Sequence, residues 1–326
     1  MQPSCVSRRG ALARTGAFLG ATLVSPAAGL RAADTSPGGS PASERFVLGF
    51  NTACIRGQKV GIEKEIEIAA GAGFRAIEPW VESIEAYVKG GGALADLRKR
   101  IADAGLSVEG AIAFPEWVVD DDARRARGLE QAKRCMDLVA QIGGSRLAAP
   151  PAGATNEPGL DLDKAAERYR ALLDVGEAMG VVPMLEVWGF SKNLNRLSNC
   201  AYVAIAAGHP KAALLADIFH LHKGGSAWDG LKVIDGGVLP VFHMNDYPAD
   251  PPRDQINDGF RCMPGDGVAP IGPVLRDLWA KDRRVVLSLE LFTRRFWEQD
   301  PAEVARTGYQ KLKAVVQQAI APARTP

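Results

Sequence analysis

The segment VVPMLE at residues 181–186 decides the fold, because three later segments repeat its design. These are AALLAD at 212–217, VLPVFH at 238–243 and RRVVLSLE at 283–290. Each is a short apolar run, typical of a buried strand, that ends on an acidic residue or a histidine. The carboxyl ends of parallel strands in a barrel open onto one face. We therefore expect the four end residues to meet in one site: Glu186, Asp217, His243 and Glu290.

The chain from residue 45 onward alternates strand-like and helix-like segments about eight times. Earlier strands are expected at 46–50, 74–78, 106–113 and 146–149, with helices between them. Helical runs at 62–72 and 162–179 stop at glycines, the usual residues at a left-handed helix end. This alternation predicts an α/β fold, a single (β/α)8 TIM barrel over residues 45–326. An open doubly wound sheet is the alternative, but no GxGxxG follows the first strand.

The first 44 residues have a different character from the rest of the chain. Ser7-Arg8-Arg9 precedes a modest apolar run and then a stretch rich in Pro, Gly and Ser. Paired arginines before such a run are typical of a twin-arginine export signal. We expect a signal peptide over residues 1–33, a flexible linker over 34–44, and a protein exported to the periplasm or beyond. A disordered basic tail is the alternative interpretation.

Composition restricts the class of partner. The 326 residues are 47% hydrophobic and 24% charged, with a net charge of +1. This balance lacks the basic surface that nucleic-acid binding requires, and no segment of the mature protein approaches the roughly 18 apolar residues of a membrane span. We expect a small-molecule carbohydrate as the substrate, and the oligomeric state, a homo-oligomer included, stays open.

Three carboxylates and one imidazole at one mouth would repel each other without a cation between them. An oxygen-rich ligand set with a single nitrogen suits one divalent ion, with Mn expected and Mg, Co or Zn as alternatives. Glu186 and Glu290 are also the candidate catalytic pair, because two carboxylates flanking one carbon can remove and return its proton. A strand-end glutamate can otherwise be a salt-bridge partner.

Other residues near the strand ends are candidates for substrate binding. Trp188 comes two residues after Glu186, and an aromatic face packs well against the C–H surface of a sugar. Glu78, before Pro79-Trp80, could bind a sugar hydroxyl or pair with a neighbour.

The order Glu, Asp, His, Glu on strands five to eight resembles the xylose isomerase-like barrels of the sugar phosphate isomerase/epimerase superfamily. Further matches are LEVWG (185–189), Asp217-x-x-His220, FHMND (242–246), RxxPGDG (261–267) and SLELF (288–292). The superfamily includes ketose 3-epimerases, inosose isomerases and dehydratases, and endonuclease IV. The resemblance covers residues 45 to about 320, and the multi-histidine cluster of endonuclease IV is not matched, since the chain has four histidines.

The resemblance implies roles for individual residues. Glu186, Asp217, His243 and Glu290 would be the metal ligands, and His220 would contact substrate beside the metal. The epimerases carry an arginine shortly after the strand-seven histidine; here position 249 is Ala, and Arg261 is the candidate replacement.

The expected function is a metal-dependent isomerase or epimerase of a sugar or cyclitol. It would work by proton abstraction next to a carbonyl, through a metal-bound enediolate. Two alternatives stay open: a lyase or dehydratase acting on a keto-sugar or 3-keto-glycoside, and a non-catalytic, metal-dependent sugar-binding protein.

Overall fold

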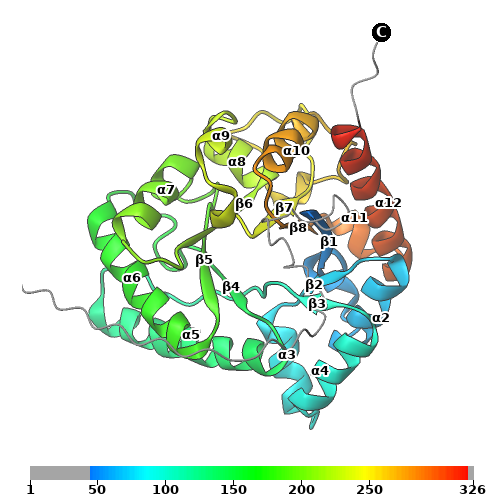
Figure 1. Ribbon diagram of the computed structural model, residues 1–326, viewed down its shortest axis with the longest axis horizontal. Helices are drawn as coiled ribbons and strands as arrows, with labels where there is room; N and C mark the ends of the chain where they lie inside the picture. Colours follow the sequence, from blue (N-terminus) through cyan, green and yellow to red (C-terminus); the bar gives the residue numbers. More distant parts are fainter. Residues whose placement is uncertain (1–44, 322–326) are drawn as a thin grey trace, which may run out of the picture. The chain divides into compact units, whose positions relative to one another are not determined.

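The structure of the protein is a computed structural model that describes residues 45–321. The expected signal peptide and linker lie outside the described residues. The described part contains eight strands, all of them parallel to their neighbours: β1 (Phe46–Asn51), β2 (Ala76–Glu78), β3 (Ser107–Val108), β4 (Arg146–Ala149), β5 (Val182–Glu186), β6 (Ala213–Asp217), β7 (Val241–Met244) and β8 (Val285–Leu289). Figure 1 shows these strands curled around a common centre with the helices outside them.

The sheet order is β3-β2-β1-β8-β7-β6-β5-β4, so β3 and β4 form the two ends of the ladder. A single backbone hydrogen bond crosses this seam, from Ala148 N to Ala111 O at 2.9 Å. The carboxylate of Glu109 also joins its two sides, because it accepts from Arg146 of β4 at 3.0 Å and from Arg284, next to β8, at 2.5 Å. The barrel is therefore closed at β1–β8 by a regular ladder and at β3–β4 by these few contacts.

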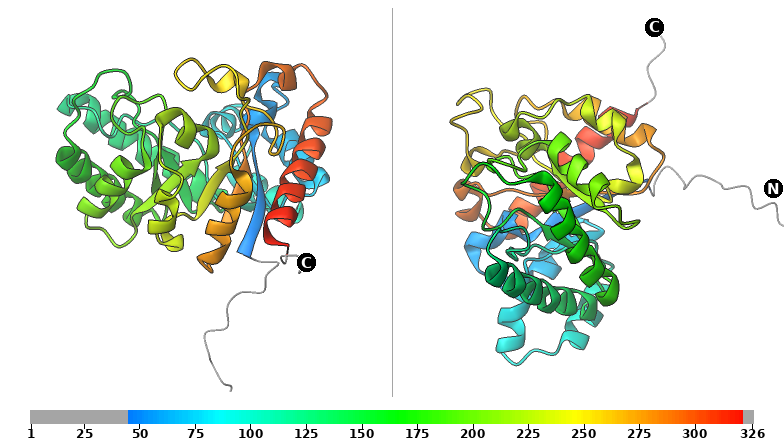
Figure 2. Two further views of the ribbon diagram at one scale, coloured as in Figure 1. Left: turned by 90° about the horizontal axis from the view of Figure 1, so that it is seen from above. Right: turned by 90° about the vertical axis from the view of Figure 1, so that its left-hand side faces the viewer.

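The helices surround the strands in chain order. They are α2 (Ile62–Ala72), α3 (Val81–Lys89), α4 (Leu94–Asp103), α5 (Asp122–Gln141), α6 (Leu162–Met179), α7 (Leu197–Ala206), α8 (Ile218–Gly224), α9 (Gly230–Val233), α10 (Ile271–Ala280), α11 (Arg294–Trp297) and α12 (Pro301–Ile320). Short 3-10 turns lie at η1 (Thr52–Gln58), η2 (Gly236–Val238) and η3 (Asp258–Phe260). The last helix, α12, lies beside β1 in Figure 2.

Local sequence explains these bounds. Helix α6 begins after Asp161, whose side chain accepts from two backbone N–H groups of the first turn. It ends at Gly180, which has a left-handed φ of 69° that a glycine adopts without strain. A separate cluster of buried apolar side chains fills the barrel interior, among them Ala76, Met184 and Val286.

Most expected elements are confirmed, and three differ. The expected third strand, 106–113, is regular only over Ser107–Val108, because a strand at the end of the sheet is paired on one side. Helix α3 was not expected. Residues 218–224 form helix α8 rather than a continued strand. Among the described residues, no helix is long and apolar enough to cross a membrane.

Candidate metal centre and active site

Asp217, His243 and Glu290 meet at the carboxyl end of the barrel, each at or just beyond the end of its strand. One atom from each lies within 4.8 Å of the other two. His243 Nδ1 is 3.8 Å from Asp217 Oδ2 and 3.2 Å from Glu290 Oε2. All three side chains are buried, so they face one another in an environment that strengthens electrostatic interactions.

Glu78 fixes the orientation of the His243 ring. Its Oε2 lies 2.8 Å from His243 Nε2 and also accepts from Asn51 at 3.1 Å and Ser288 at 2.9 Å. Nε2 therefore carries a proton, and Nδ1 points at the two carboxylates with no hydrogen-bond partner in the described part of the chain. A histidine whose far nitrogen donates to a carboxylate while the near one stays free is the usual arrangement of a metal ligand.

Negative charge exceeds positive charge in this site. Four carboxyls are buried here (Glu78, Glu186, Asp217 and Glu290), whereas Arg261 is the buried guanidinium that contacts them. Burial disfavours a charged imidazole, but the charges of Glu290 and Glu78 outweigh it and raise the pKa of His243 well above its ordinary value. The free Nδ1 and the surplus of carboxylates fit a divalent cation with mixed oxygen and nitrogen ligands.

Glu186 ends β5 and is 6% exposed, but it is not one of the three residues that cluster within 4.8 Å. Burial raises the pKa of its carboxyl to about 8, opposed by His243 and reinforced by Glu290, Asp217 and Glu78. The structure thus brings three of the four expected ligands together and leaves Glu186 as a carboxyl that retains its proton near neutral pH.

Arg261 lies fully buried beside this cluster. Its guanidinium donates to Asp217 Oδ2 and Glu290 Oε2, both at 2.9 Å, and to Asp258 at 2.8 Å. A further nitrogen lies 3.2 Å from His220 Nε2. Because arginine only donates, His220 Nε2 must accept, and burial lowers the pKa of His220 so that the ring is neutral. The His220 proton therefore sits on Nδ1, which has no partner among residues 45–321 and is free to bind a substrate oxygen.

The loop that carries Arg261 is held by a single carboxylate. Asp246 accepts from the backbone N–H groups of Tyr247, Gly265, Gly267 and Ala269 at 2.8–3.0 Å. Its own backbone pairs with Cys262 in both directions at 2.9 Å. A Cβ at Gly267 would lie 2.2 Å from Tyr247 O, so glycine is required for this close approach. The RCMPGDG turn is thereby fastened to the end of β7.

Aromatic side chains surround the mouth above the carboxylates. Ring centroids are 6.0 Å apart for Phe292 and Trp80, 5.4 Å for Trp80 and Phe114, and 5.8 Å for Phe114 and Trp188. We call these four residues the aromatic collar. The ring centroids of Trp188 and His220 are 6.0 Å apart, and the Arg261 guanidinium lies 5.0 Å from the Phe292 ring. Because Arg261 also contacts His220, the six side chains form a closed ring of contacts.

Sequence reasoning named the charged members of this site and missed the polar ones. Asn51 bridges Glu78 and Glu290 at 3.1 and 2.9 Å, and Asn245 donates to Asp217 Oδ2 at 2.8 Å. Asn51 ends β1 and Asn245 follows β7, so both occupy the strand-end positions that identified the expected ligands. That position is the sequence feature by which they could have been found. Glu78, considered for a sugar hydroxyl or a neighbouring side chain, has the protein partners described above.

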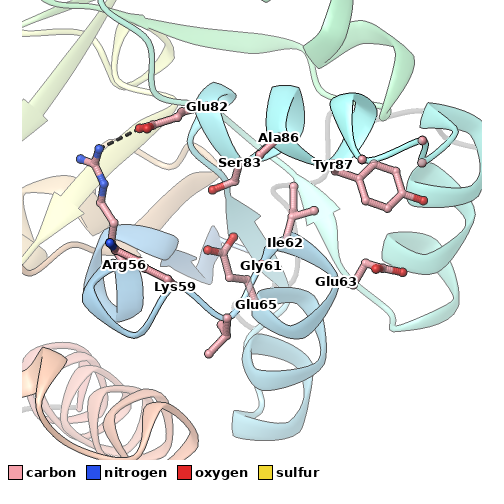
Figure 3. Close-up of a pocket in the computed structure, with 14 residues that line it drawn as sticks. Arg56, Lys59, Gly61, Ile62, Glu63, Glu65, Glu82, Ser83, Ala86 and Tyr87 are labelled. Atoms are coloured by element: carbon pink, nitrogen blue, oxygen red, sulfur yellow. Dashed lines mark hydrogen bonds and ion pairs between the residues drawn. The ribbon is translucent and has the colours of Figure 1, made fainter.

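A further cavity lies away from this centre. It measures about 840 Å³ and opens between α2 and α3, where Figure 3 shows Glu65 pointing toward Ser83 and the Arg56–Glu82 ion pair at its edge. Its residues do not contact the carboxylate cluster. Arg56 is the link between the two regions, because its guanidinium lies 4.0 Å from the Trp80 ring of the collar.

Comparison with known proteins agrees with this geometry. Residues 66–315 match the family described as "Xylose isomerase-like TIM barrel". The chain belongs to this family. An inosose isomerase of Bacillus velezensis is 30% identical over 152 residues, which cover 46% of this chain and 54% of that protein. A 3-dehydroshikimate dehydratase of Pseudomonas aeruginosa is 25% identical over 236 residues, 71% of this chain and 36% of that protein.

The chain thus spans about half the length of the inosose isomerase that it matches. Among solved structures, the "IOLI protein with a binding zinc atom" superposes with a TM-score of 0.78 at 22% identity, over 85% of this chain and 100% of that chain. This likeness establishes the xylose isomerase-like fold.

Proposed function

We propose that this protein is a divalent-metal-dependent isomerase or epimerase of a sugar or cyclitol, acting by proton transfer at a carbon next to a carbonyl. The observation that carries the proposal is the convergence of His243 Nδ1, Asp217 and Glu290 in a site with surplus buried carboxyls. The similarity to an inosose isomerase and to a solved L-ribulose 3-epimerase fold supports the class of reaction.

The cation would be held by Asp217, His243 and Glu290, with Glu186 as the proposed fourth ligand and Mn, Mg, Co or Zn as the candidate ions. A bound divalent ion supplies a positive charge that polarises the substrate carbonyl and favours loss of the neighbouring proton.

The side chains of the site supply the proton transfers. Glu290 accepts hydrogen bonds from Asn51 and Arg261, which hold its carboxylate in place as a proton acceptor. Glu186 ends β5, on a different strand from Glu290, and is the residue proposed to return the proton. The Nδ1–H of His220 is a donor for a substrate oxygen, Trp188 offers its face to the ring, and Arg261, whose N–H groups are taken by Asp217, Glu290, Asp258 and His220, positions these side chains rather than the substrate.

A lyase or dehydratase reaction is the second candidate. Two relatives of this chain are 3-dehydroshikimate dehydratases, from Pseudomonas aeruginosa and Pseudomonas putida. The same acid and base could expel a hydroxyl from the carbon next to the one that loses its proton.

Proton NMR in deuterated water distinguishes these reactions. We expect the Mn-reconstituted protein to place deuterium next to the carbonyl of an inosose or ketose without loss of a substituent. Release of water or of an aglycone would indicate the lyase. If none of the ketoses, inososes and 3-keto-glycosides exchanges a proton for deuterium or loses a substituent, both enzymatic proposals are wrong. Sugar binding without catalysis would then be the remaining function.

Two substitutions separate metal binding from chemistry. Asp217→Ala should lower the bound metal measured by elemental analysis, because it removes a ligand. Glu290→Gln should abolish exchange while most metal is kept, because an amide oxygen can still coordinate but cannot accept the proton. Glu109→Gln, a carboxylate at the opposite end of the barrel, is the matched control and should leave both quantities unchanged.

Export is a separate proposal. We infer from Ser7-Arg8-Arg9 that the chain leaves the cytoplasm already folded, which would allow the metal to be acquired before export.

A further inference from the structure

The aromatic collar limits what can reach the metal ligands. Asp217 and His243 are fully buried and Glu290 is 3% exposed beneath it. Any substrate therefore passes between aromatic rings and meets their faces. A ring-shaped molecule with C–H faces and hydroxyl edges matches this opening, because the faces pack on the aromatics while an edge reaches the unpartnered Nδ1 of His220.

Charge at the collar points to a neutral substrate. Two cations touch it: Arg261 beside Phe292 and Arg56 beside Trp80. Arg261 is paired with Asp217, Asp258 and Glu290, and Arg56 is paired with Glu82 at 2.8 Å. Neither guanidinium has its charge available for a phosphate, and the buried carboxyls below would repel one.

A second cavity shares two of its lining residues, Trp80 and Phe114, with the collar. It measures about 440 Å³ and is lined by side chains of α3, α5 and the segment after β3. Its walls combine apolar groups with hydrogen-bonding ones, including Ile112, Cys135, Glu85 and Gln131. Phe114, 38% exposed, lines this cavity and also contacts Trp80 and Trp188 of the collar. A sugar ring suits such mixed walls better than a purely apolar group, since it has both C–H faces and hydroxyls.

We propose that the substrate is a neutral two-ring carbohydrate. A keto-sugar or keto-cyclitol ring lies inside the collar, and a glycosyl group joined to it occupies the cavity between α3 and α5 against Trp80 and Phe114. This inference rests on the proposed function, because it assigns the substrate class of the same site.

Calorimetric titration of the Mn-reconstituted protein tests the proposal through binding alone. The probes are an inosose, its O-glucosyl derivative and its monophosphate. We expect the glucosyl derivative to bind at least tenfold more tightly than the inosose, and the monophosphate more weakly than either. Gln131→Trp fills the cavity and should reduce the glucosyl preference to about one. Gln141→Trp, the same change at the last residue of α5 and outside the cavity lining, should leave the preference intact.

Phe114→Ala provides a second variant, which removes one wall of the cavity and should lower the preference at least fivefold. Equal affinity of the wild type for the inosose and its glucosyl derivative, or binding of neither, would overturn the proposal. So would tighter binding of a phenyl derivative than of the glucosyl one, which would indicate an aryl group instead.

Binding and turnover separate the two proposals. A glucosyl preference without deuterium exchange would leave this inference standing and remove the proposed function. Deuterium exchange of the inosose without tighter binding of its glucosyl derivative would support the proposed function and overturn the two-ring substrate.

Discussion

Glu78 controls a neighbouring side chain rather than the substrate. Because its carboxylate accepts from His243 Nε2, the opposite nitrogen is left free to coordinate. Glu78→Gln removes the negative charge and puts an N–H beside the same nitrogen in one of its two orientations. We expect metal affinity to fall about 10- to 100-fold, the usual effect of losing such a partner. Titration with Mn measures this, and an unchanged Kd would contradict the orienting role; Glu109→Gln serves as the control.

Glu65 provides a prediction outside the metal centre. It is 5% exposed, its Oε2 has no partner among the described residues, and burial raises its pKa from 4.5 to about 7. The side chain is protonated in both states below pH 4.5, so its contribution to stability is complete there. As pH rises toward 7 and beyond, the unfolded chain ionises more easily, and that contribution is lost.

The substitution Glu65→Gln should therefore raise the free energy of unfolding at pH 8 by about 1–3 kcal/mol and change it little at pH 4. Denaturant unfolding at the two pH values measures both. Glu63→Gln, in the same helix turn, removes an exposed ion pair with Arg100 and should be neutral or slightly destabilising at pH 8. Equal effects of Glu65→Gln at both pH values would show that the carboxyl is solvated.

Sequence alone identified the residues that carry charge but not their partners. Asp217, His243 and Glu290 could be named because each ends an apolar run. The roles of Asn51, Ser288 and Glu78 depend on distances between strands far apart in the chain, and an asparagine or serine at a strand end has many ordinary uses.

The segment between β7 and α10 is the element that brings Arg261 to the metal ligands. Its regular structure is limited to η3, so its shape depends on the carboxylate of Asp246. Asp246→Ala leaves four backbone N–H groups without their acceptor. We expect a loss of about 2–3 kcal/mol in stability and faster amide exchange over residues 262–269.

Asp254→Ala, an exposed aspartate in the same segment, is the control and should alter neither quantity. Amide exchange over 262–269 that stays at the wild-type rate in Asp246→Ala would show that other contacts hold the turn.

Elements with strong periodicity were predictable, and those shaped by their neighbours were not. Helix 62–72 carries its own apolar stripe and its own glycine stop, and it forms with those bounds. The third strand is short because pairing on one side limits it, and α8 replaces a continued strand because Asp217 caps a helix by accepting from His220 N at 2.7 Å. The short strand follows from tertiary position, which a single segment does not encode, whereas the cap of α8 is a local contact that the strand-like run before it concealed.

For the molecule as a whole, eight strand ends in chain order were enough to anticipate the barrel and the face that bears the site. The seam between β3 and β4 was not foreseeable, since an alternating pattern contains no information about which neighbours fail to pair.

The remaining prediction concerns the whole chain and its first residues. Replacing Arg8 and Arg9 by Lys should leave the precursor inside the cell, because recognition by the twin-arginine route requires the paired arginines. Immunoblots of cytoplasmic and periplasmic fractions measure this. The matched control replaces Arg14 by Lys, outside the pair, and normal export of the Arg8/Arg9 variant would exclude this route.

Two of the six tryptophans of the chain, Trp80 and Trp188, stand in the collar. Trp80 donates its indole N–H to Asn51, which in turn contacts Glu290, whereas Trp117 is fully buried and bonded to a backbone carbonyl elsewhere. Indole emission depends on the polarity of its surroundings. A ligand that enters the mouth is therefore expected to change the emission wavelength and intensity of Trp80 and Trp188. Intrinsic tryptophan fluorescence can thus report binding without a label.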